Sequence, residues 1–223
     1  MELKDDIRLY CLGESAITIE STKPASIGLQ KKIWCITEFY RNKAFVSDVV
    51  PGMNNLTIIF DMYQIDLKQE LQVLLSLWQD IEMSSYDHEK VIEVPVIYGG
   101  DNGPDLKGVA AYHGISQEEV VRLHSDSEYI VYFLGFQPGF AYLGGMPARL
   151  TTPRHASPRA IVPKGSVAIG GAQTGVYPNR SPGGWQIIGK TDVELFDVNR
   201  EQPAIWMPGD RVHFVAKEIL TND

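Results

Sequence analysis

The stretch that decides the fold lies in the second half of the chain, at 160–188, and reads AIVPKGSVAIGGAQTGVYPNRSPGGWQII. Short runs of apolar and β-branched residues alternate in it with glycine and proline, a pattern typical of short strands joined by tight turns. The same pattern of short apolar runs between glycine and proline continues on both sides of this stretch. Many short strands with this punctuation predict an all-β barrel or sandwich. The expected strands are Tyr129–Leu134, Ala160–Val162, Ser166–Ile169, Trp185–Ile188, Val193–Phe196 and Arg211–Val215.

The first half of the chain predicts a different architecture. Two alternating runs around Gly13-Glu14 indicate a hairpin, and apolar stripes at helical spacing follow at two places. The order is ββαββα followed by a further β, which predicts a ferredoxin-like α+β domain with its helices on one face of an antiparallel sheet. Its expected elements are strands Ile7–Cys11, Ala16–Glu20, Phe45–Val50, Leu56–Phe60 and Val91–Tyr98, a helix after Ser26 to about Arg41, and a helix from the N-cap Asp66 to Ile81.

A polar stretch, Met83–Lys90, separates the predicted α+β half from the predicted all-β half and marks the expected domain boundary. Past it, Gly103-Pro104-Asp105 opens a short helix that ends near Gly114. Ser116-Gln117-Glu118-Glu119 has the spacing of a capping box and predicts a second short helix. The predicted domains are 1–88 and 89–223.

The composition is that of an ordinary globular chain, with 44% hydrophobic and 22% charged side chains in 223 residues. Cys11 and Cys35 lack zinc-site or redox spacing and are expected to be buried reduced thiols. The longest apolar run is far shorter than the roughly twenty residues of a membrane-spanning helix. Because the first residues are acidic, where a signal peptide is basic and then apolar, we expect a cytoplasmic protein without a membrane partner. A net charge of −8 argues against a nucleic-acid partner.

Charge is distributed unevenly along the chain. The window 129–191 contains no aspartate or glutamate and carries a net charge of +6, so the rest of the chain carries −14. We expect these cations to converge on one hollow for an anionic ligand. The alternative is that a Gly/Pro-rich β region has few exposed helical faces for glutamate to occupy. The cations are Arg149, Arg154, Arg159, Lys164, Arg180 and Lys190.

One segment spells a phosphate-binding loop. Gly184 to Thr191 matches G-x-x-x-x-G-K-[ST], which cradles phosphate when a buried strand precedes it and a helix starts at the lysine. Here Ser181-Pro182-Gly183 precedes it, and its middle residues include a tryptophan and two isoleucines that prefer an extended strand. We therefore expect a strand at this position.

Two further segments are candidates for a binding site. Gly135–Gly145 sets Phe136, Phe140 and Tyr142 on a glycine-rich backbone that a ligand can approach; a packed core corner is the alternative. Arg154 and Arg159 each follow a proline, and their guanidinium groups suit carboxylate or phosphate; solvated surface arginines are the alternative.

The sequence lacks the motifs of some common classes of enzyme. The sequence contains neither G-x-S-x-G nor H-E-x-x-H, and His155 is the one histidine inside the cationic window. Magnesium-dependent phosphoryl transfer needs carboxylates to hold the metal, and the window supplies none. Ligands for Mg²⁺ would have to come from outside 129–191 or from another polypeptide.

The motifs of the second half together resemble one family, the B subunit of the bacterial ATP-dependent 5-oxoprolinase, also called allophanate hydrolase subunit 1 or the KipI-type inhibitor of a sporulation histidine kinase. The resemblance spans nearly the whole chain and is densest after residue 100. It is carried by Gly103-Pro104-Asp105-Leu106, Leu134–Gly145, Pro153-Arg154, Pro158-Arg159, Val162–Val167, Gln173–Pro178, Ser181–Gly189 and Pro208–Phe214.

The resemblance implies a small α+β domain followed by a cyclophilin-like β-barrel. It also implies work beside a homologous barrel chain, the C subunit of 5-oxoprolinase, and beside the A subunit of that enzyme. Together they open 5-oxo-L-proline to L-glutamate with hydrolysis of ATP, with Mg²⁺ as the expected companion of the nucleotide.

The resemblance also implies roles for individual residues. On this reading two arginines bind anionic groups, three polar residues orient the substrate and three aromatic residues form the pocket wall; no catalytic residue is identified. The arginines are Arg154 and Arg159, the polar residues are Gln173, Tyr177 and Ser181, and the aromatic residues are Phe140, Tyr142 and Trp185.

Two other functions stay open at this point. The same cleft could grip a helical hairpin of a sensor histidine kinase and block its autophosphorylation, in which case the cleft should be apolar. Polar, anion-ready residues around the cleft favour the enzyme. Prolyl isomerase activity from the barrel alone is a weaker reading, because fold does not dictate chemistry.

Overall fold

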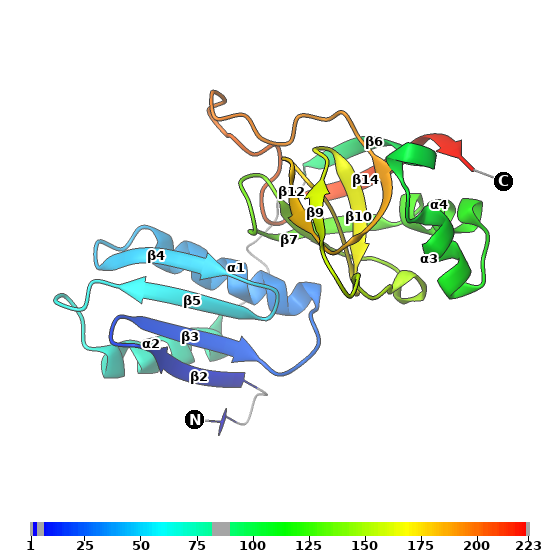
Figure 1. Ribbon diagram of the computed structural model, residues 1–223. Helices are drawn as coiled ribbons and strands as arrows, with labels where there is room; N and C mark the ends of the chain where they lie inside the picture. Colours follow the sequence, from blue (N-terminus) through cyan, green and yellow to red (C-terminus); the bar gives the residue numbers. More distant parts are fainter. Residues whose placement is uncertain (1, 4–6, 82–89, 222–223) are drawn as a thin grey trace. The chain divides into compact units, whose positions relative to one another are not determined.

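The computed structural model describes residues 2–3, 7–81 and 90–221 (Figure 1). The chain divides into two compact units, Met1–Asp87 and His88–Asp223. Most of the boundary predicted at Met83–Lys90 lies outside the described residues. Each unit has its own hydrophobic core.

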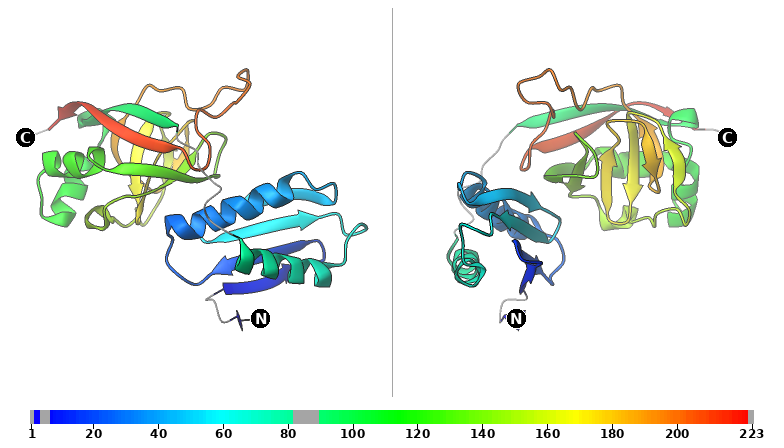
Figure 2. Two further views of the ribbon diagram at one scale, coloured as in Figure 1. Left: turned by 180° about the vertical axis from the view of Figure 1, so that it is seen from behind. Right: turned by 60° about the vertical axis from the view of Figure 1, so that its left-hand side comes forward.

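The first unit is a small α+β structure. Its five strands pair only antiparallel, in the order β1-β2-β3-β5-β4. Both helices lie on one face of the sheet, where α1 packs against β4 and β5 and α2 against β2 and β3 (Figure 2). The elements are β1 (Glu2–Leu3), β2 (Ile7–Leu12), β3 (Ala16–Ser21), α1 (Ile27–Arg41), β4 (Val46–Pro51), β5 (Asn55–Phe60) and α2 (Leu67–Asp80).

Side-chain caps set the starts of both helices. The hydroxyl of Ser26 accepts a hydrogen bond from the N–H of Leu29 at 3.2 Å, and the carboxylate of Asp66 accepts from the N–H of Lys68 at 2.8 Å. The predicted hairpin, strands and helices of this unit are confirmed. The last β of the predicted ββαββαβ order is wrong, however, because Val91–Gly99 pairs with strands of the second unit.

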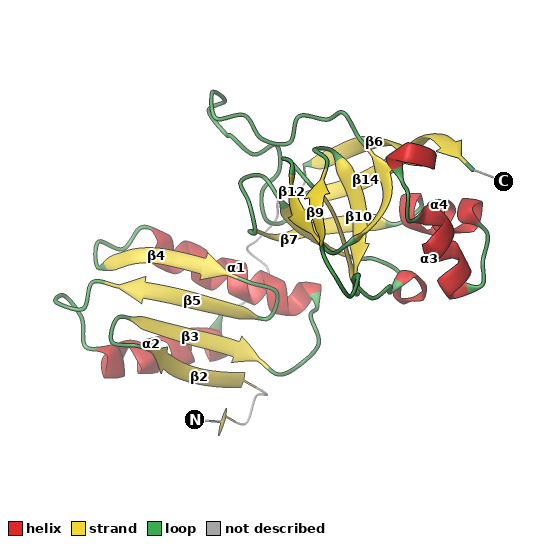
Figure 3. Cartoon of the chain, in the orientation of Figure 1, coloured by secondary structure: helices red, strands yellow, loops and turns green. Residues whose placement is uncertain are grey.

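The second unit is a closed barrel of seven strands in the order β10-β11-β8-β7-β14-β6-β13 (Figure 3). The strands β6 and β14 run parallel, and every other pairing in the barrel is antiparallel. The strands β9 and β12 form a separate two-stranded sheet. The bounds are β6 (Val91–Gly99), β7 (Glu128–Leu134), β8 (Ala141–Gly144), β9 (Arg159–Val162), β10 (Ser166–Gly170), β11 (Gln173–Val176), β12 (Ser181–Gly183), β13 (Gln186–Lys190) and β14 (Arg211–Leu220).

In the second unit, one predicted strand is wrong and three observed strands were not predicted; in the first unit, the short β1 was not predicted. Val193–Phe196 is irregular chain that makes a single bridge, from Phe196 to Ala204. The missed strands β8, β11 and β12 all contain glycine and lack long β-branched runs. The barrel is confirmed, while the finer ferredoxin-like and cyclophilin-like descriptions stay predictions.

The two short helices occur where the sequence predicts them, as α3 (Leu106–His113) and α4 (Gln117–Ser125). Gly114 ends α3 with a left-handed φ of 64°, and the hydroxyl of Ser116 accepts from the N–H of Glu119. The two helices pack on each other, α3 against β13 and α4 against β14. None of the helices among the described residues has the length and apolar character that crossing a membrane requires.

The cysteines differ from the expectation in their burial. Neither forms a disulfide with a described residue, but Cys11 is exposed and Cys35 is half-buried. Cys11 has the register of the buried Ile7 and Leu9, but it lies towards the end of β2, where residues 10–12 are all exposed.

A buried histidine holds a polar network inside the barrel. His124 Nδ1 lies 2.8 Å from the Tyr98 hydroxyl, and Nε2 lies 2.8 Å from Thr174 Oγ1. Because the Thr174 hydroxyl donates to the carbonyl of Ala168, it accepts from Nε2–H, which leaves Nδ1 to accept from Tyr98. Burial lowers the pKa of His124 to about 3, so the ring is neutral in the folded protein.

This network predicts an acid-sensitive fold. An unfolded histidine takes up its proton near pH 6.5, whereas folded His124 does so only near pH 3, so the unfolded state binds more protons between these values. We expect His124 to lower the free energy of unfolding by about 1.4 kcal/mol per unit as the pH falls below 6.5. Urea denaturation between pH 7 and pH 5 measures this slope. The variant His124→Gln should show a shallower slope, and equal slopes would rule out the assignment.

Candidate functional site

Aromatic side chains enclose a hollow of about 280 Å³ on the barrel unit. Phe140, Tyr177 and Trp185 are almost fully buried, and Tyr142 packs against them. Phe140 lies at the centre of the cluster, with its ring 5.6 Å from both Tyr177 and Trp185 and 5.0 Å from Tyr142, in edge-to-face arrangements. We call this the aromatic hollow; it is lined by Phe136, Phe140, Tyr142, Arg154, Pro158, Tyr177, Pro182, Gly183, Gly184 and Trp185.

Two glycines make room for the rings. A Cβ at Gly170 would lie 2.4 Å from the indole of Trp185, and a Cβ at Gly183 would lie 2.4 Å from the hydroxyl of Tyr177. Any larger residue would push the ring out of place, because the obstructing atoms belong to buried, rigid groups. The backbone of β10 and β12 therefore fixes the shape of the aromatic hollow.

Arg154 supplies the positive charge of the aromatic hollow. Its guanidinium carbon lies 5.5 Å from the centre of the Trp185 ring, a cation–π distance. The loop that carries it is tied down, because the N–H of His155 donates to the carbonyl of Gly184 and the Gln186 amide donates to the carbonyl of Pro153. Burial raises the pKa of Tyr177, although Arg154 and Arg159 act in the opposite direction, so its phenol stays a hydrogen-bond donor at neutral pH.

Arg159 faces a different hollow, of about 250 Å³. Its Nη2 donates to Asp105 Oδ1 at 2.5 Å, and its Nη1 lies 2.7 Å from His155 Nε2. We call this the second hollow; it is lined by Asp101, Asn102, Pro104, Arg159, Ile161, Pro163, Ser166, Ile187 and Lys190.

Asp105 joins the helix, the barrel and the arginine. Its Oδ2 accepts from the N–H of Ile187 at 2.6 Å, and its own N–H donates to the carbonyl of the same residue. A guanidinium only donates, so His155 Nε2 accepts from Arg159 and His155 is neutral. The 3.3 Å approach of that nitrogen to Asp105 is therefore a contact and not an ion pair.

The six cations of the window do not converge on one hollow, so that prediction is wrong. Arg154 lines the aromatic hollow, whereas Arg159 and Lys190 line the second hollow. Arg149 pairs with Glu119 at 3.4 Å, and Lys164 pairs with Glu194 at 2.7 Å. The reason is that residues from outside the window bring the carboxylates that the window itself lacks.

The structure gathers five of the eight predicted site residues in the aromatic hollow. Gln173 and Ser181 line neither hollow; their side-chain atoms Nε2 and Oγ are buried and have no hydrogen-bond partner among the described residues. Such unpaired buried groups are uncommon and mark places where a ligand or water can bind. The five gathered residues are Phe140, Tyr142, Arg154, Tyr177 and Trp185.

Asp105 is the residue that sequence reasoning missed. It belongs to the motif Gly103-Pro104-Asp105-Leu106, which predicts only a helix start, and it lies outside the cationic window. A carboxylate at a helix start was the available signal, because such residues often have backbone partners. Its actual partner, Arg159, is separated from it by 54 residues and could not be predicted from local spacing.

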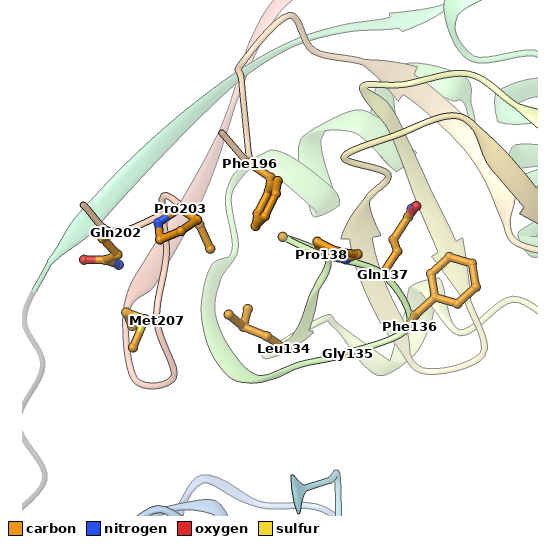
Figure 4. Close-up of a pocket in the computed structure, with 11 residues that line it drawn as sticks. Leu134, Gly135, Phe136, Gln137, Pro138, Phe196, Gln202, Pro203 and Met207 are labelled. Carbon is orange, nitrogen blue, oxygen red and sulfur yellow. The ribbon is translucent and has the colours of Figure 1, made fainter. Parts of the chain in front are cut away.

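A third, apolar groove of about 490 Å³ begins beside the aromatic hollow (Figure 4). Phe136 borders both, lies exposed, and has a φ of 65°, the one positive φ of a non-glycine residue in the described part of the chain. Figure 4 shows it at the opposite end of the groove from Gln202 and Met207. The indole N–H of Trp206 donates to the carbonyl of Gly139 at 3.0 Å and so anchors the loop.

Two expectations about cofactor chemistry can be compared with the structure. The segment that spells a phosphate-binding loop forms strand β13 up to Lys190, as expected. Within residues 2–3, 7–81 and 90–221, there is no group of three or more His, Cys, Asp or Glu side chains that could hold a metal ion.

Comparisons with known proteins place this chain in context. The family model described as carboxyltransferase domain, subdomain C and D, matches residues 7–206. The chain is 46% identical over 211 residues to the B subunit of 5-oxoprolinase from Escherichia coli O157:H7, covering 95% of this chain and 96% of the relative. It is 37% identical over 220 residues to the B subunit of 5-oxoprolinase from Bacillus subtilis (strain 168), covering 92% and 90%.

A solved structure has the same fold. The crystal structure of TTHA0988 in space group P212121 is similar with a TM-score of 0.78 and 34% identity, over 93% of this chain. This chain covers only 41% of that one.

Proposed function

This chain belongs to the family of the 5-oxoprolinase B subunits, and we propose that it is one subunit of an ATP-dependent hydrolase of a cyclic amide. The family model that matches it is described as carboxyltransferase domain, subdomain C and D. The proposed reaction opens 5-oxo-L-proline to L-glutamate with hydrolysis of ATP. The observation that carries the proposal is the 46% identity to a 5-oxoprolinase chain over nearly the full length of both proteins.

The chemistry of the aromatic hollow supports an anionic substrate. Arg154 offers a guanidinium over an aromatic face, and Tyr177 offers a phenolic donor. In the proposal Arg154 and Arg159 bind anionic groups and Phe140, Tyr142 and Trp185 wall the pocket. The remaining polar residues, Gln173, Tyr177 and Ser181, orient the substrate by hydrogen bonds.

The lactam of 5-oxoproline is a stable amide, and ATP is the co-substrate that would activate it for attack by water. We assign no catalytic residue of this chain to that step. Mg²⁺ would enter with the nucleotide, with ligands outside 129–191 or from a partner.

Partner chains are part of the proposal. The curated relatives are named as one lettered subunit of 5-oxoprolinase, which supports an assembly of several chains. We propose that a homologous barrel chain, the C subunit, and the A subunit complete the enzyme and that this chain is inactive alone. The kinase-inhibitor alternative has no support from the relatives, and the presence of Arg154 in the aromatic hollow weighs against an apolar cleft.

The decisive experiment compares this chain alone with its mixture with the products of the neighbouring genes. Glutamate release from 5-oxoproline in the presence of ATP is measured in both. We expect release only in the mixture. Release by no combination, together with inhibition of kinase autophosphorylation by this chain, would overturn the proposal and favour the alternative.

Arg154 gives a sharper test of the site. In the active mixture, Arg154→Ala should lower kcat/KM for 5-oxoproline roughly ten- to hundredfold, because a charge-assisted contact contributes about 1.5–3 kcal/mol. Arg180→Ala is the matched control, since Arg180 is exposed and lines none of the three hollows described. Equal kcat/KM in wild type and Arg154→Ala would remove Arg154 from the site.

A further inference from the structure

We propose that the second hollow is a binding site for the oxygens of a small anion, a phosphoryl or carboxylate group, held by Lys190, Ser166 and Arg159. None of the roles proposed above involves Lys190 or Ser166. The inference rests on the geometry of this chain alone, so it does not require the proposed enzymatic activity.

The strand register places the first two groups side by side. Ser166 on β10 and Lys190 on β13 are direct partners in an antiparallel pair. Directly opposite residues have Cβ atoms about 4.5–5.5 Å apart and project from the same face of the sheet. Both residues line the second hollow, so the register places a lysine and a serine side by side in its wall.

Neither group has a partner within the described part of the chain. Ser166 is 2% exposed, and its hydroxyl makes no hydrogen bond to any described residue. Lys190 as a residue is half-buried, and its ammonium forms no ion pair with a described residue, although Asp101 lines the same hollow. An anion in the hollow would give both donors an acceptor at once.

The third group is held in place before a ligand arrives. Asp105 and His155 each accept one hydrogen bond from Arg159, which fixes the guanidinium plane and leaves its other N–H groups available. Fixing a long side chain beforehand reduces the entropy lost when an anion binds.

The remaining lining defines the class of ligand. An ammonium, a hydroxyl and a guanidinium together are a donor set suited to phosphate or carboxylate oxygens. Asp101 is the one acidic side chain of the lining, and it is exposed, so water screens its repulsion. The apolar side chains of Ile161 and Ile187 complete the wall without offering hydrogen bonds to a cation.

The test titrates the full chain with inorganic phosphate and, separately, with acetate, and follows backbone amide shifts by NMR. We expect saturable shifts at Ser166, Ile187 and Lys190 with at least one of the two anions. Tighter binding of phosphate identifies a phosphoryl site, and tighter binding of acetate identifies a carboxylate site. Absence of saturable shifts at these residues with both anions would overturn the proposal.

Variants separate a built site from the general attraction of positive charge. Lys190→Gln should weaken binding about tenfold or more, and Ser166→Ala several-fold, whereas Lys190→Arg should largely retain binding. Arg180→Gln removes the same charge from an exposed position and should leave the affinity nearly unchanged. Equal losses in Lys190→Gln and Arg180→Gln would contradict the proposal.

Two further controls complete the design. Amide spectra of each variant show whether it remains folded. Asp101→Asn should tighten binding only slightly, because water already screens the repulsion of this exposed carboxylate. Glutamate release by the mixture of chains is scored separately. Activity without anion binding refutes this site alone, and anion binding without activity in any mixture refutes only the proposed reaction.

Discussion

Replacing Trp185 by alanine should lower the free energy of unfolding of the barrel unit by about 3–5 kcal/mol, the cost of removing a large, well-packed aromatic side chain. Trp185 is 6% exposed and contacts the rings of Phe140 and Tyr142. Gly170 lies directly beneath its indole and has no side chain that could fill the space. The loss also removes the aromatic face over which Arg154 lies, so the aromatic hollow should lose its shape.

Hydrogen exchange of the β10 and β13 amides under mild denaturant measures this effect in the barrel unit. Trp185→Phe keeps part of the wall and should cost less than the alanine variant. Tyr112→Ala is the control for loss of an exposed ring, and its effect should stay within about 0.5 kcal/mol. A Trp185→Ala protein as stable as the Tyr112→Ala control would show that the indole does not form part of a packed wall.

Replacing Asp105 by alanine should also lower the free energy of unfolding substantially. The Asp105 side chain is 11% exposed and that of Arg159 is 32% exposed, so the variant leaves a largely buried guanidinium without its counter-charge. It also leaves the N–H of Ile187 without its acceptor. Breaking a fully buried pair costs about 3–5 kcal/mol, and with the partial exposure of Arg159 we expect about 2–4 kcal/mol.

Asp101→Ala is the matched control, because it removes one negative charge from the exposed rim of the same hollow. Urea denaturation of both variants and of wild type gives the comparison. We expect Asp101→Ala to unfold close to the wild-type midpoint. If the two aspartate variants are destabilised equally, the ion pair with Arg159 does not hold the helix start to the barrel.

Local patterns predicted most helices and strands because local interactions determine them. Asp66 and Ser116 cap the helices that their positions predict, and the apolar stripe of α1 faces the core. Strands β8 and β11 were missed because glycine within them weakens the strand pattern, while their pairing partners lie elsewhere in the chain. Val193–Phe196 has the alternation of a strand but no long pairing partner.

Part of the candidate site could be predicted because some of its residues are close together in the sequence. The aromatic residues of one loop meet because the loop is short, and Trp185 packs against them beside the glycines of β10 and β11. The predicted convergence of the cations on one hollow is wrong because the sequence alone does not show which carboxylates lie next to which cations in the fold. Glu119, Glu194 and Asp105 all come from outside the cationic window.

The position of β6 in the barrel has a consequence for how the protein is made. This strand follows the first unit directly in sequence, yet its neighbours are β13 and the parallel strand β14, which ends at Leu220. On the ribosome, β6 must therefore wait for roughly a hundred later residues before both its edges are covered. Nascent chains halted before β14 should expose an unpaired, apolar strand edge, and folding helpers that bind such edges would act during that interval.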